Sequence, residues 1–221
     1  MSRLLRFWHS TIGKKVVMAA TGIVGIGFLV AHVAGNLLVF RGAAALNQYS
    51  AFLHGPAAEL LWLMRAVLLA AVLLHVLAAV QLTHLSRAAR PSDYATRVPQ
   101  VSTLASRLMR WGGALLLVFI VVHILHFTTG SLRPGGRFVP GDVYGNLVGS
   151  FRVWWVSLFY IVAVAFLGLH LYHGAWASAR TLGATGGSPN SLHRSVAAVI
   201  AVAVWLGFTI VPVVVLIGWV G

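Results

Sequence analysis

The sequence predicts an all-α integral membrane protein, because its composition is strongly apolar and long apolar stretches recur along it. The chain has 221 residues, of which 59% are hydrophobic, and its mean hydropathy is +0.90. A helix needs roughly 20 predominantly apolar residues to cross a bilayer. Five stretches meet this requirement, and they run approximately over Val16–Phe40, Leu60–Leu85, Trp111–Thr129, Val153–Ser178 and Val196–Val220. Little chain remains for a soluble domain, so residues 1–221 are expected to form a single transmembrane domain.

Each stretch carries its own boundary signals. The first follows Lys14, is too long for a signal-peptide core and lacks a convincing cleavage site, so we expect a mature helix. The second ends before Arg87, the third begins after Arg110, and the fourth ends before Arg180. The fifth contains Pro212, a candidate kink. Seven tryptophans near the predicted boundaries are typical of an interfacial aromatic belt: Trp8, Trp62, Trp111, Trp154, Trp155, Trp176 and Trp219.

The distribution of charge predicts the orientation of the chain. The net charge is +13, with 16 Lys and Arg against 3 Asp and Glu. Eleven of the basic residues lie on the side of the N-terminus and four on the opposite side, with Arg65 just inside the second stretch. The positive-inside rule then places the N-terminus in the cytoplasm and the C-terminus outside. Topology and contacts with anionic lipid account for most of this charge, so nucleic acid is not expected as a partner. Some of the cytoplasmic basic residues could also dock a soluble partner.

Four histidines are the strongest functional signal in the sequence. His32, His75, His123 and His170 lie in four separate apolar stretches, and the fifth stretch has none. An imidazole in hydrocarbon is costly unless its lone pair is used, so such residues are candidates for a functional site. At 1.5 Å per residue, His32 and His123 lie roughly 10–12 Å below the outer boundary, and His75 and His170 about 15–18 Å from the cytoplasmic end. The depths predict an outer pair, His32 with His123, and an inner pair, His75 with His170, each as the axial ligands of a haem iron.

The absence of cysteine narrows the kind of cofactor. It excludes disulfides, thiolate-ligated iron–sulfur clusters in this chain and covalent attachment of haem. Methionine is a poor competitor as a ligand, because Met1 is terminal and Met18, Met64 and Met109 lie close to helix ends. We therefore expect two haems of the b type, each held by two histidines.

Two further histidines lie close to the predicted ligands. His126 and His173 follow His123 and His170 at i+3, on nearly the same helix face, and lie shallower by roughly 4.5 Å. We expect them to hydrogen-bond a haem propionate, a quinone or the backbone rather than the iron. A polar residue satisfied between two helices explains them equally well.

Eleven segments resemble, in order, the cytochrome b membrane anchor of succinate:quinone oxidoreductases. They are Gly13–Lys15, Met18–Gly22, Gly27–His32, Gly35–Leu37, Ala45–Leu53, Leu61–Arg65, Leu74–Val76, Arg87–Pro91, His123–Thr128, Asp142–Tyr144 and Leu169–Gly174. The resemblance spans nearly the whole chain and points to the class with five helices, one subunit and two haems. It implies iron ligands at His32, His75, His123 and His170, in the same pairs.

The resemblance also implies a function and partners. In such a succinate dehydrogenase, the respiratory complex II of the tricarboxylic acid cycle, a flavoprotein partner oxidises succinate at FAD. Iron–sulfur clusters of a second partner pass the electrons to the haems and to a quinone, which the family type suggests is menaquinone. This chain alone is not expected to oxidise succinate. It would be a multi-pass protein of the cell inner (cytoplasmic) membrane, and the complex could form a higher oligomer.

Two other functions remain open from the sequence. One is the anchor of a quinol:fumarate reductase, which runs the same reaction in reverse. The other is a haem-free membrane scaffold or transporter. A transporter more often shows internal repeats or broken helices, and we find no convincing repeat here.

A quinone pocket is expected where this chain meets one membrane face. Candidates on the cytoplasmic side are Ser10, Gly13 and Lys14, and candidates on the outer side are Asn47, Tyr49, Glu59, Arg65 and His126. Helix capping and headgroup contacts explain any one of them equally well. The resemblance implies that a membrane carboxylate could transfer protons, and among the acids Glu59, Asp93 and Asp142 only Glu59 is a plausible candidate. An ordinary acid at a helix N-terminus explains Glu59 better. The outer loop Ser131–Arg152 is shorter than expected of relatives, which could alter an outer cavity.

Overall fold

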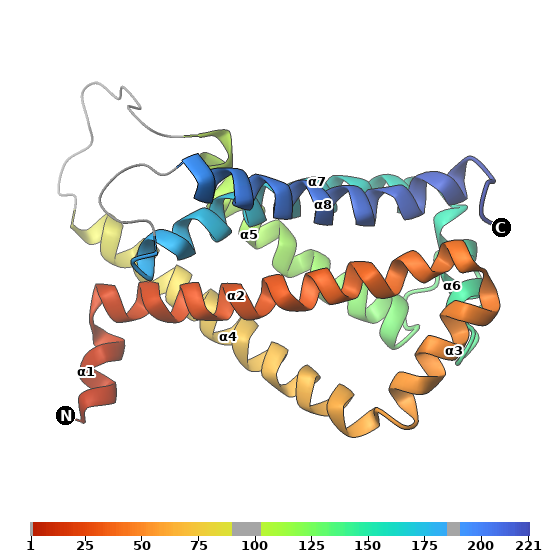
Figure 1. Ribbon diagram of the computed structural model, residues 1–221, viewed down its shortest axis with the longest axis horizontal. Coiled ribbons are helices and arrows are strands. Elements are labelled where there is room, and N and C mark those ends of the chain that lie inside the picture. The colour runs from red at the N-terminus through yellow and green to blue at the C-terminus, as the bar shows by residue number, and fades with distance from the viewer. Residues whose placement is uncertain (1, 90–102, 185–190) are drawn as a thin grey trace.

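The computed structural model describes residues 2–89, 103–184 and 191–221, and in these ranges it contains helices and no strands (Figure 1). Asp93 and the last two residues of the Arg87–Pro91 segment lie outside the described residues.

Five helices are long and apolar enough to cross a membrane, as the sequence predicts. They are α2 (Thr11–Asn36), α4 (Ala58–Ala88), α5 (Leu104–His123), α7 (Trp154–Thr181) and α8 (Ser191–Leu216). A 3₁₀ segment, Leu37–Arg41, extends α2, and a π-helical segment, Ile124–Thr128, extends α5. The chain is therefore a multi-pass membrane protein.

The predicted helix ends differ from the observed ones. The third helix begins at Leu104 rather than Trp111, because the Thr103 hydroxyl accepts a hydrogen bond from the Ser106 N–H and caps a polar first turn. The fifth ends at Leu216 rather than Val220, because Gly218 adopts a φ of 75° and turns the chain. Hydropathy marks the part of a helix that lies in lipid, and a capped helix continues beyond it.

Three short helices were not predicted. They are α1 (Arg3–His9), α3 (Ala43–His54) and α6 (Val143–Phe151). Figure 1 shows α1 turned away from the direction of α2, and α3 and α6 close together at the opposite end of the molecule. Residues 131–152 are a predicted loop, but α6 begins there at an N-cap, where the Asp142 carboxylate accepts a hydrogen bond from the Gly145 N–H at 3.0 Å.

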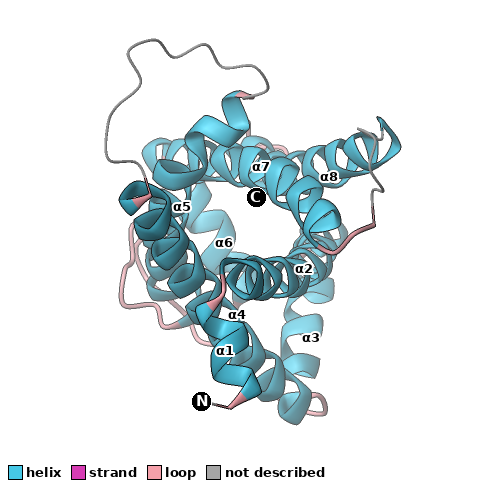
Figure 2. Ribbon diagram, turned by 90° about the vertical axis from the view of Figure 1, so that its left-hand side faces the viewer, coloured by secondary structure: helices cyan, strands magenta, loops and turns pink. Residues whose placement is uncertain are grey.

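The long helices pack in a definite order. α2 packs closely against α4 and α7, α5 packs against α7, and α8 packs mainly against α7. Within the described ranges, α2 and α5 are not closely packed, and neither are α4 and α7. Seen end-on, the helices surround an interior across which these two pairs face each other (Figure 2). Side chains that meet in this interior therefore come from helices whose backbones stay apart.

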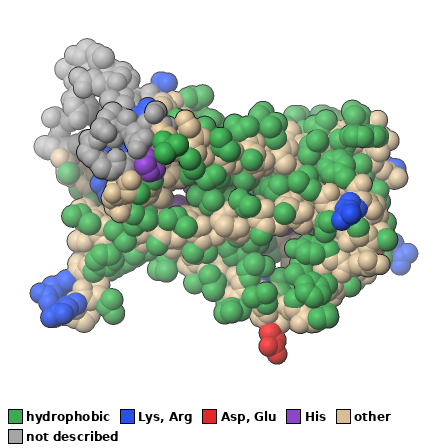
Figure 3. Space-filling model, viewed as in Figure 1, with side chains coloured by type: hydrophobic (Ala, Val, Ile, Leu, Met, Phe, Trp, Pro, Cys, Tyr) green, Lys and Arg blue, Asp and Glu red, His purple; other side chains and the backbone are tan. Residues whose placement is uncertain are grey.

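The main buried core lies at the end of the molecule that holds α3 and α6. It joins side chains from five segments: Val39, Leu46, Leu147, Val148, Phe151, Val156, Tyr160, Val211 and Val215. Elsewhere the outer surface is largely apolar, and hydrophobic side chains cover most of the visible face (Figure 3). An apolar exterior is expected of helices that face lipid.

Candidate functional site: two pairs of histidines

The structure brings the four histidines together in the two predicted pairs. The ring centroids of His32 and His123 lie 5.9 Å apart, and those of His75 and His170 lie 6.2 Å apart. The first pair joins α2 to α5 and the second joins α4 to α7, which are the two helix pairs that do not pack closely. Each pair of imidazoles therefore spans the interior from opposite sides.

The two pairs lie at different levels along the helices. On α2, Thr21 contacts the His75 ring and His32 faces His123, and these residues are separated by roughly 16 Å of helix rise. On α7, Tyr160 contacts the His123 ring, and His170 follows it by about 15 Å. The distance between the two histidine pairs is therefore nearly the same along α2 and along α7. The two pairs form two layers within the interior of the helix bundle.

Thr21 sets the orientation of the His75 ring. The Thr21 hydroxyl donates to the Val17 carbonyl at 2.8 Å, so it accepts from His75 Nδ1–H at 3.1 Å. This assigns the proton to Nδ1 and leaves the lone pair on Nε2. A hydrogen bond of this kind is how proteins orient a metal-binding imidazole.

Aromatic rings surround the other layer. Phe28 stacks on the His32 ring at 5.2 Å between centroids, and the Phe208 ring centroid lies 5.4 Å from that of His32. Phe119 and Phe127 lie 5.8 and 5.7 Å from the His123 ring. These rings provide a dry, apolar wall around the first pair.

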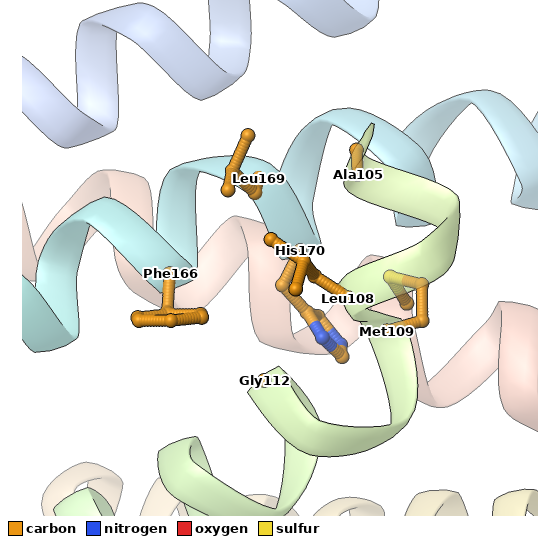
Figure 4. Close-up of a pocket in the computed structure, with 7 residues that line it drawn as sticks. All are labelled: Ala105, Leu108, Met109, Gly112, Phe166, Leu169 and His170. Atoms are coloured by element: carbon orange, nitrogen blue, oxygen red, sulfur yellow. The ribbon is translucent and has the colours of Figure 1, made fainter. Parts of the chain in front are cut away.

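Two of the four imidazoles have unused polar atoms. The Nδ1 atoms of His123 and His170 are buried and have no hydrogen-bond partner. His170 also lines a small pocket between α5 and α7, together with Ala105, Leu108, Met109, Gly112, Phe166 and Leu169 (Figure 4). Burying an imidazole nitrogen without a hydrogen-bond partner is costly, so a further polar partner at either atom would be favourable.

Glycines face the histidine layers. A Cβ on Gly22 would lie 3.7 Å from His75 Cε1, and one on Gly113 would lie 3.8 Å from His170 Cε1. A Cβ on Gly25, seven residues before His32, would meet nothing within 4 Å. Gly35 has another role, because the ring of Tyr49 packs against it where a larger residue would have its side chain. The four histidines themselves are only half-buried, and histidine side chains are visible at the floor of hollows in the surface (Figure 3).

The residues present fit a haem with two axial histidines. Two imidazoles on opposite sides of one metal, each at a bond length of about 2 Å, have ring centroids about 6 Å apart. Both observed separations match this value. Within the described residues, no three His, Asp or Glu side chains gather as a metal site. A porphyrin supplies four of the six iron ligands, so two imidazoles are sufficient for it.

His126 lies three residues after His123, and both rings contact Phe127 and Tyr160. Its side chain is 4% exposed, its Nδ1 lies 2.9 Å from the Tyr160 hydroxyl, and its Nε2 lies 2.8 Å from Ser150 Oγ. Ser150 Oγ donates to the Asn146 carbonyl, so it accepts from His126 Nε2–H, and Nδ1 accepts from Tyr160. The π-helical turn that holds His126 begins directly after His123. The hydrogen bonds of His126 to Tyr160 and Ser150 agree with the alternative of a polar residue satisfied between helices. His173 is half-buried in α7.

The cytoplasmic quinone candidates are used within the chain. The Ser10 hydroxyl accepts from the Gly13 N–H at 2.8 Å and caps α2. Lys14 is 4% exposed, and its Nζ donates to the carbonyls of Trp8 and His9 at 2.7 and 3.1 Å. These bonds hold α1 at its angle to α2.

The outer quinone candidates do not form one cluster. Among the described residues, no hydrogen bond or ion pair joins Tyr49, Glu59, Arg65 and His126 to one another. Arg65 lies 4.9 Å from the Trp62 ring centre and 3.4 Å from His54 Nε2, and Glu59 is exposed.

Asn47, the remaining outer candidate, also forms its hydrogen bonds within the chain. Its amide donates to Asp142 at 3.0 Å and its carbonyl accepts from the Tyr144 N–H at 2.9 Å, which ties α3 to α6.

A second cavity lies at this end of the molecule. It is bounded by the π-helical segment, the following loop and α6. Its lining includes polar side chains from all three: His126, Arg133, Arg137, Asn146 and Ser150. Of the outer candidates predicted from sequence, only His126 lines it.

Sequence reasoning missed Thr21, Tyr160 and Ser150. A spacing of eleven residues between Thr21 and His32 is close to three helical turns, so it would have placed Thr21 on the same interior face. No comparable signal marks Ser150, because its role depends on how α6 folds back against the π-helical segment.

Comparisons with known proteins identify no relative: no protein-family model matches the chain, and neither a curated protein nor a solved structure matches it.

Proposed function

We propose that this chain is the cytochrome b membrane anchor of a succinate:quinone oxidoreductase. The observation that carries the proposal is the meeting of four intramembrane histidines as two pairs, each across a helix pair that does not pack closely. The ordered sequence resemblance to such anchors supports the same function.

The proposed role of the four histidines is to hold two b-type haems. His32 and His123 would ligate the outer one, and His75 and His170 the inner one. When bound, each haem supplies an iron that accepts and releases one electron. Thr21 orients His75, and the phenylalanines around His32 and His123 exclude water from the outer layer. Burial and these contacts would tune the potential of each site.

The proposed orientation follows from charge. With the N-terminus in the cytoplasm and the C-terminus outside, the His75–His170 pair lies nearer the cytoplasmic face of the inner (cytoplasmic) membrane. A flavoprotein and an iron–sulfur partner would dock on that face and deliver electrons from succinate. The same arrangement serves a quinol:fumarate reductase, because ligand geometry is independent of the direction of electron flow.

The proposed site for the quinone, expected to be menaquinone, is the second cavity. It lies at the end of the molecule that holds α6 and is lined by both polar and apolar side chains. Arg133 and Arg137 line it and could donate to a quinone carbonyl. It borders His126, whose partner Tyr160 contacts the His123 ring. These contacts support a quinone site beside the His32–His123 pair.

A haem count on the purified protein tests the proposal. A reduced-minus-oxidised spectrum, combined with protein determination, is expected to give two b-type haems per chain. His32→Ala and His75→Ala are each expected to remove one. An intact, fully loaded preparation that contains one haem or none would overturn the proposal, and a spectrum of two haems that survives both substitutions would overturn the ligand assignment.

A further inference from the structure

Two arginines share one tryptophan where α7 ends and α8 begins. The Arg180 guanidinium carbon lies 5.6 Å from the centre of the Trp176 ring, and that of Arg194 lies 4.8 Å from it. Arg180 belongs to the last turn of α7 and Arg194 to the first turn of α8. A single indole thus holds two cations from two different membrane-spanning helices.

The described residues offer no negative charge to this cluster. The first turn of α8 contains no acid, and no carboxylate of the described chain forms an ion pair with either arginine. Asp142 caps α6, beyond the opposite end of α7, and Glu59 is in the first turn of α4, next to α3. Two polar atoms at the start of α8, Arg194 Nε and His193 Nδ1, are buried without a hydrogen-bond partner.

This arrangement is electrostatically unfavourable as it stands. The N-terminus of a helix carries a partial positive charge, and a cation in its first turn is repelled rather than stabilised. Arg194 and Arg180 also repel each other, more strongly where water is excluded. One anion between them would offset all three positive contributions and could accept a hydrogen bond from Arg194 Nε–H.

The surroundings favour a lipid as the source of that anion. Leu192, Val196 and Val199 of α8 are 63%, 49% and 67% exposed, so apolar surface begins in the same turn as the charge. By helical spacing these residues lie on the other side of α8 from Arg194. A cationic pocket between two helices at the level where apolar surface begins is the kind of site that binds anionic headgroups.

We propose that Arg180 and Arg194, arranged around Trp176, bind the phosphate group of an anionic phospholipid. The planar guanidinium presents paired N–H donors that match phosphate oxygens. The tryptophan ring holds both donors in place without competing for the ligand. The bound lipid fastens the end of α8 to α7.

Lipid titration of the purified full-length chain tests this site. Binding of phosphatidylglycerol, with phosphatidylcholine for comparison, is measured by native mass spectrometry and by the rise in Tm. Arg194→Gln and Arg180→Gln are each expected to weaken phosphatidylglycerol binding about tenfold. Arg87→Gln removes an exposed arginine from the last turn of α4 and is the matched control, expected to bind as the parent does.

Three results would overturn the proposal. Equal losses in Arg87→Gln and Arg194→Gln would mean that diffuse positive charge attracts the lipid. The same rise in Tm with inorganic phosphate alone would assign a small anion instead. If both variants lose haem absorbance but bind phosphatidylglycerol as the parent does, the anion between the two arginines is a porphyrin carboxylate and not a lipid phosphate. Because lipid binding is measured without reference to haem, a parent protein that lacks haem but binds phosphatidylglycerol would overturn the proposed function and leave this site standing.

Discussion

His123 and His126 are only three residues apart, but their ring nitrogens differ in hydrogen bonding. His123 faces His32 across the interior and keeps a buried nitrogen without a partner. His126 has both ring nitrogens engaged, by Tyr160 and by Ser150. An imidazole with both nitrogens engaged has no lone pair for a metal. The hydrogen bonds thus favour His123 as the ligand.

The first prediction compares these neighbours. His123→Ala is expected to abolish the outer haem signal, while His126→Ala leaves two haems bound with altered potential, since it changes only the surroundings of the iron. Haem count and a redox titration measure both. On α7, His170→Ala and His173→Ala make the same comparison for the inner haem. Loss of the outer haem in His126→Ala but not in His123→Ala would reverse the assignment.

The second prediction concerns Thr21. Thr21→Val keeps the shape of the side chain but removes the acceptor for His75 Nδ1–H. Loss of such a contact typically weakens metal binding about 10- to 100-fold, so we expect a weaker inner haem with a shifted potential and an unchanged outer haem. Thr21→Ser retains the hydroxyl and is expected to behave as the parent does. If the serine and valine variants shift equally, the hydrogen bond has no role.

At the scale of single elements, α3 and α6 are held together by polar bonds in an otherwise apolar chain. Asn47 of α3 bonds both Asp142 and the Tyr144 N–H at the start of α6. The Gly145 N–H and the Asn47 amide lower the pKa of Asp142, because both stabilise its charged form. This junction supports α6, which in turn positions Ser150 beside His126.

The third prediction is the pH dependence of this junction. Because the folded pKa lies below the ordinary value of 3.8, the charged carboxylate stabilises the fold above that value, and the contribution is lost as the pH falls through the folded pKa. Asp142→Ala is expected to cost about 1 kcal/mol near pH 7, with the difference in Tm shrinking as the pH falls below about 4. Glu59→Ala, in an exposed position, is the control. A difference that is constant with pH would exclude the charge as its source.

The fourth prediction tests the space beside the histidine layers. Gly25 lies on the His32 side of α2, two turns away, and a Cβ there meets nothing within 4 Å. Gly25→Leu is expected to fill the interior and reduce haem content, whereas Gly27→Leu, which periodicity turns away from that face, keeps two haems. Haem absorbance per chain, with circular dichroism to confirm helix content, distinguishes them. Equal haem content in both variants would mean that Gly25 does not border the site.

At the scale of the whole molecule, the five long helices and the largely apolar surface define a multi-pass membrane protein. The charges lie mainly beyond the ends of the apolar segments, and their excess on the N-terminal side predicts the orientation. Orientation decides which histidine pair lies nearer the cytoplasm and hence the order in which electrons would pass through them.

The fifth prediction concerns that orientation. The chain has no cysteine, so a single Cys introduced at Ser2 or at Gly221 is a unique label. In intact cells, a membrane-impermeant thiol reagent is expected to label Gly221→Cys but not Ser2→Cys, and to label both after lysis. Labelling of Ser2→Cys alone in intact cells would show that the topology is the opposite of the predicted one.

The sequence by itself determined the five membrane spans, because apolar length is a local property that the bilayer reads directly. It also predicted the partners within each histidine pair, because helix rise converts residue number into depth. It did not determine the start of α5 or the three short helices, since caps and turns outside lipid leave little trace in hydropathy. Only the tertiary structure decided the packing order of the helices, the π-helical turn that follows His123, and the junction of Asn47 with Asp142. These features arise where segments distant in sequence compete for the same space and the same hydrogen-bonding groups, and no local pattern records the outcome.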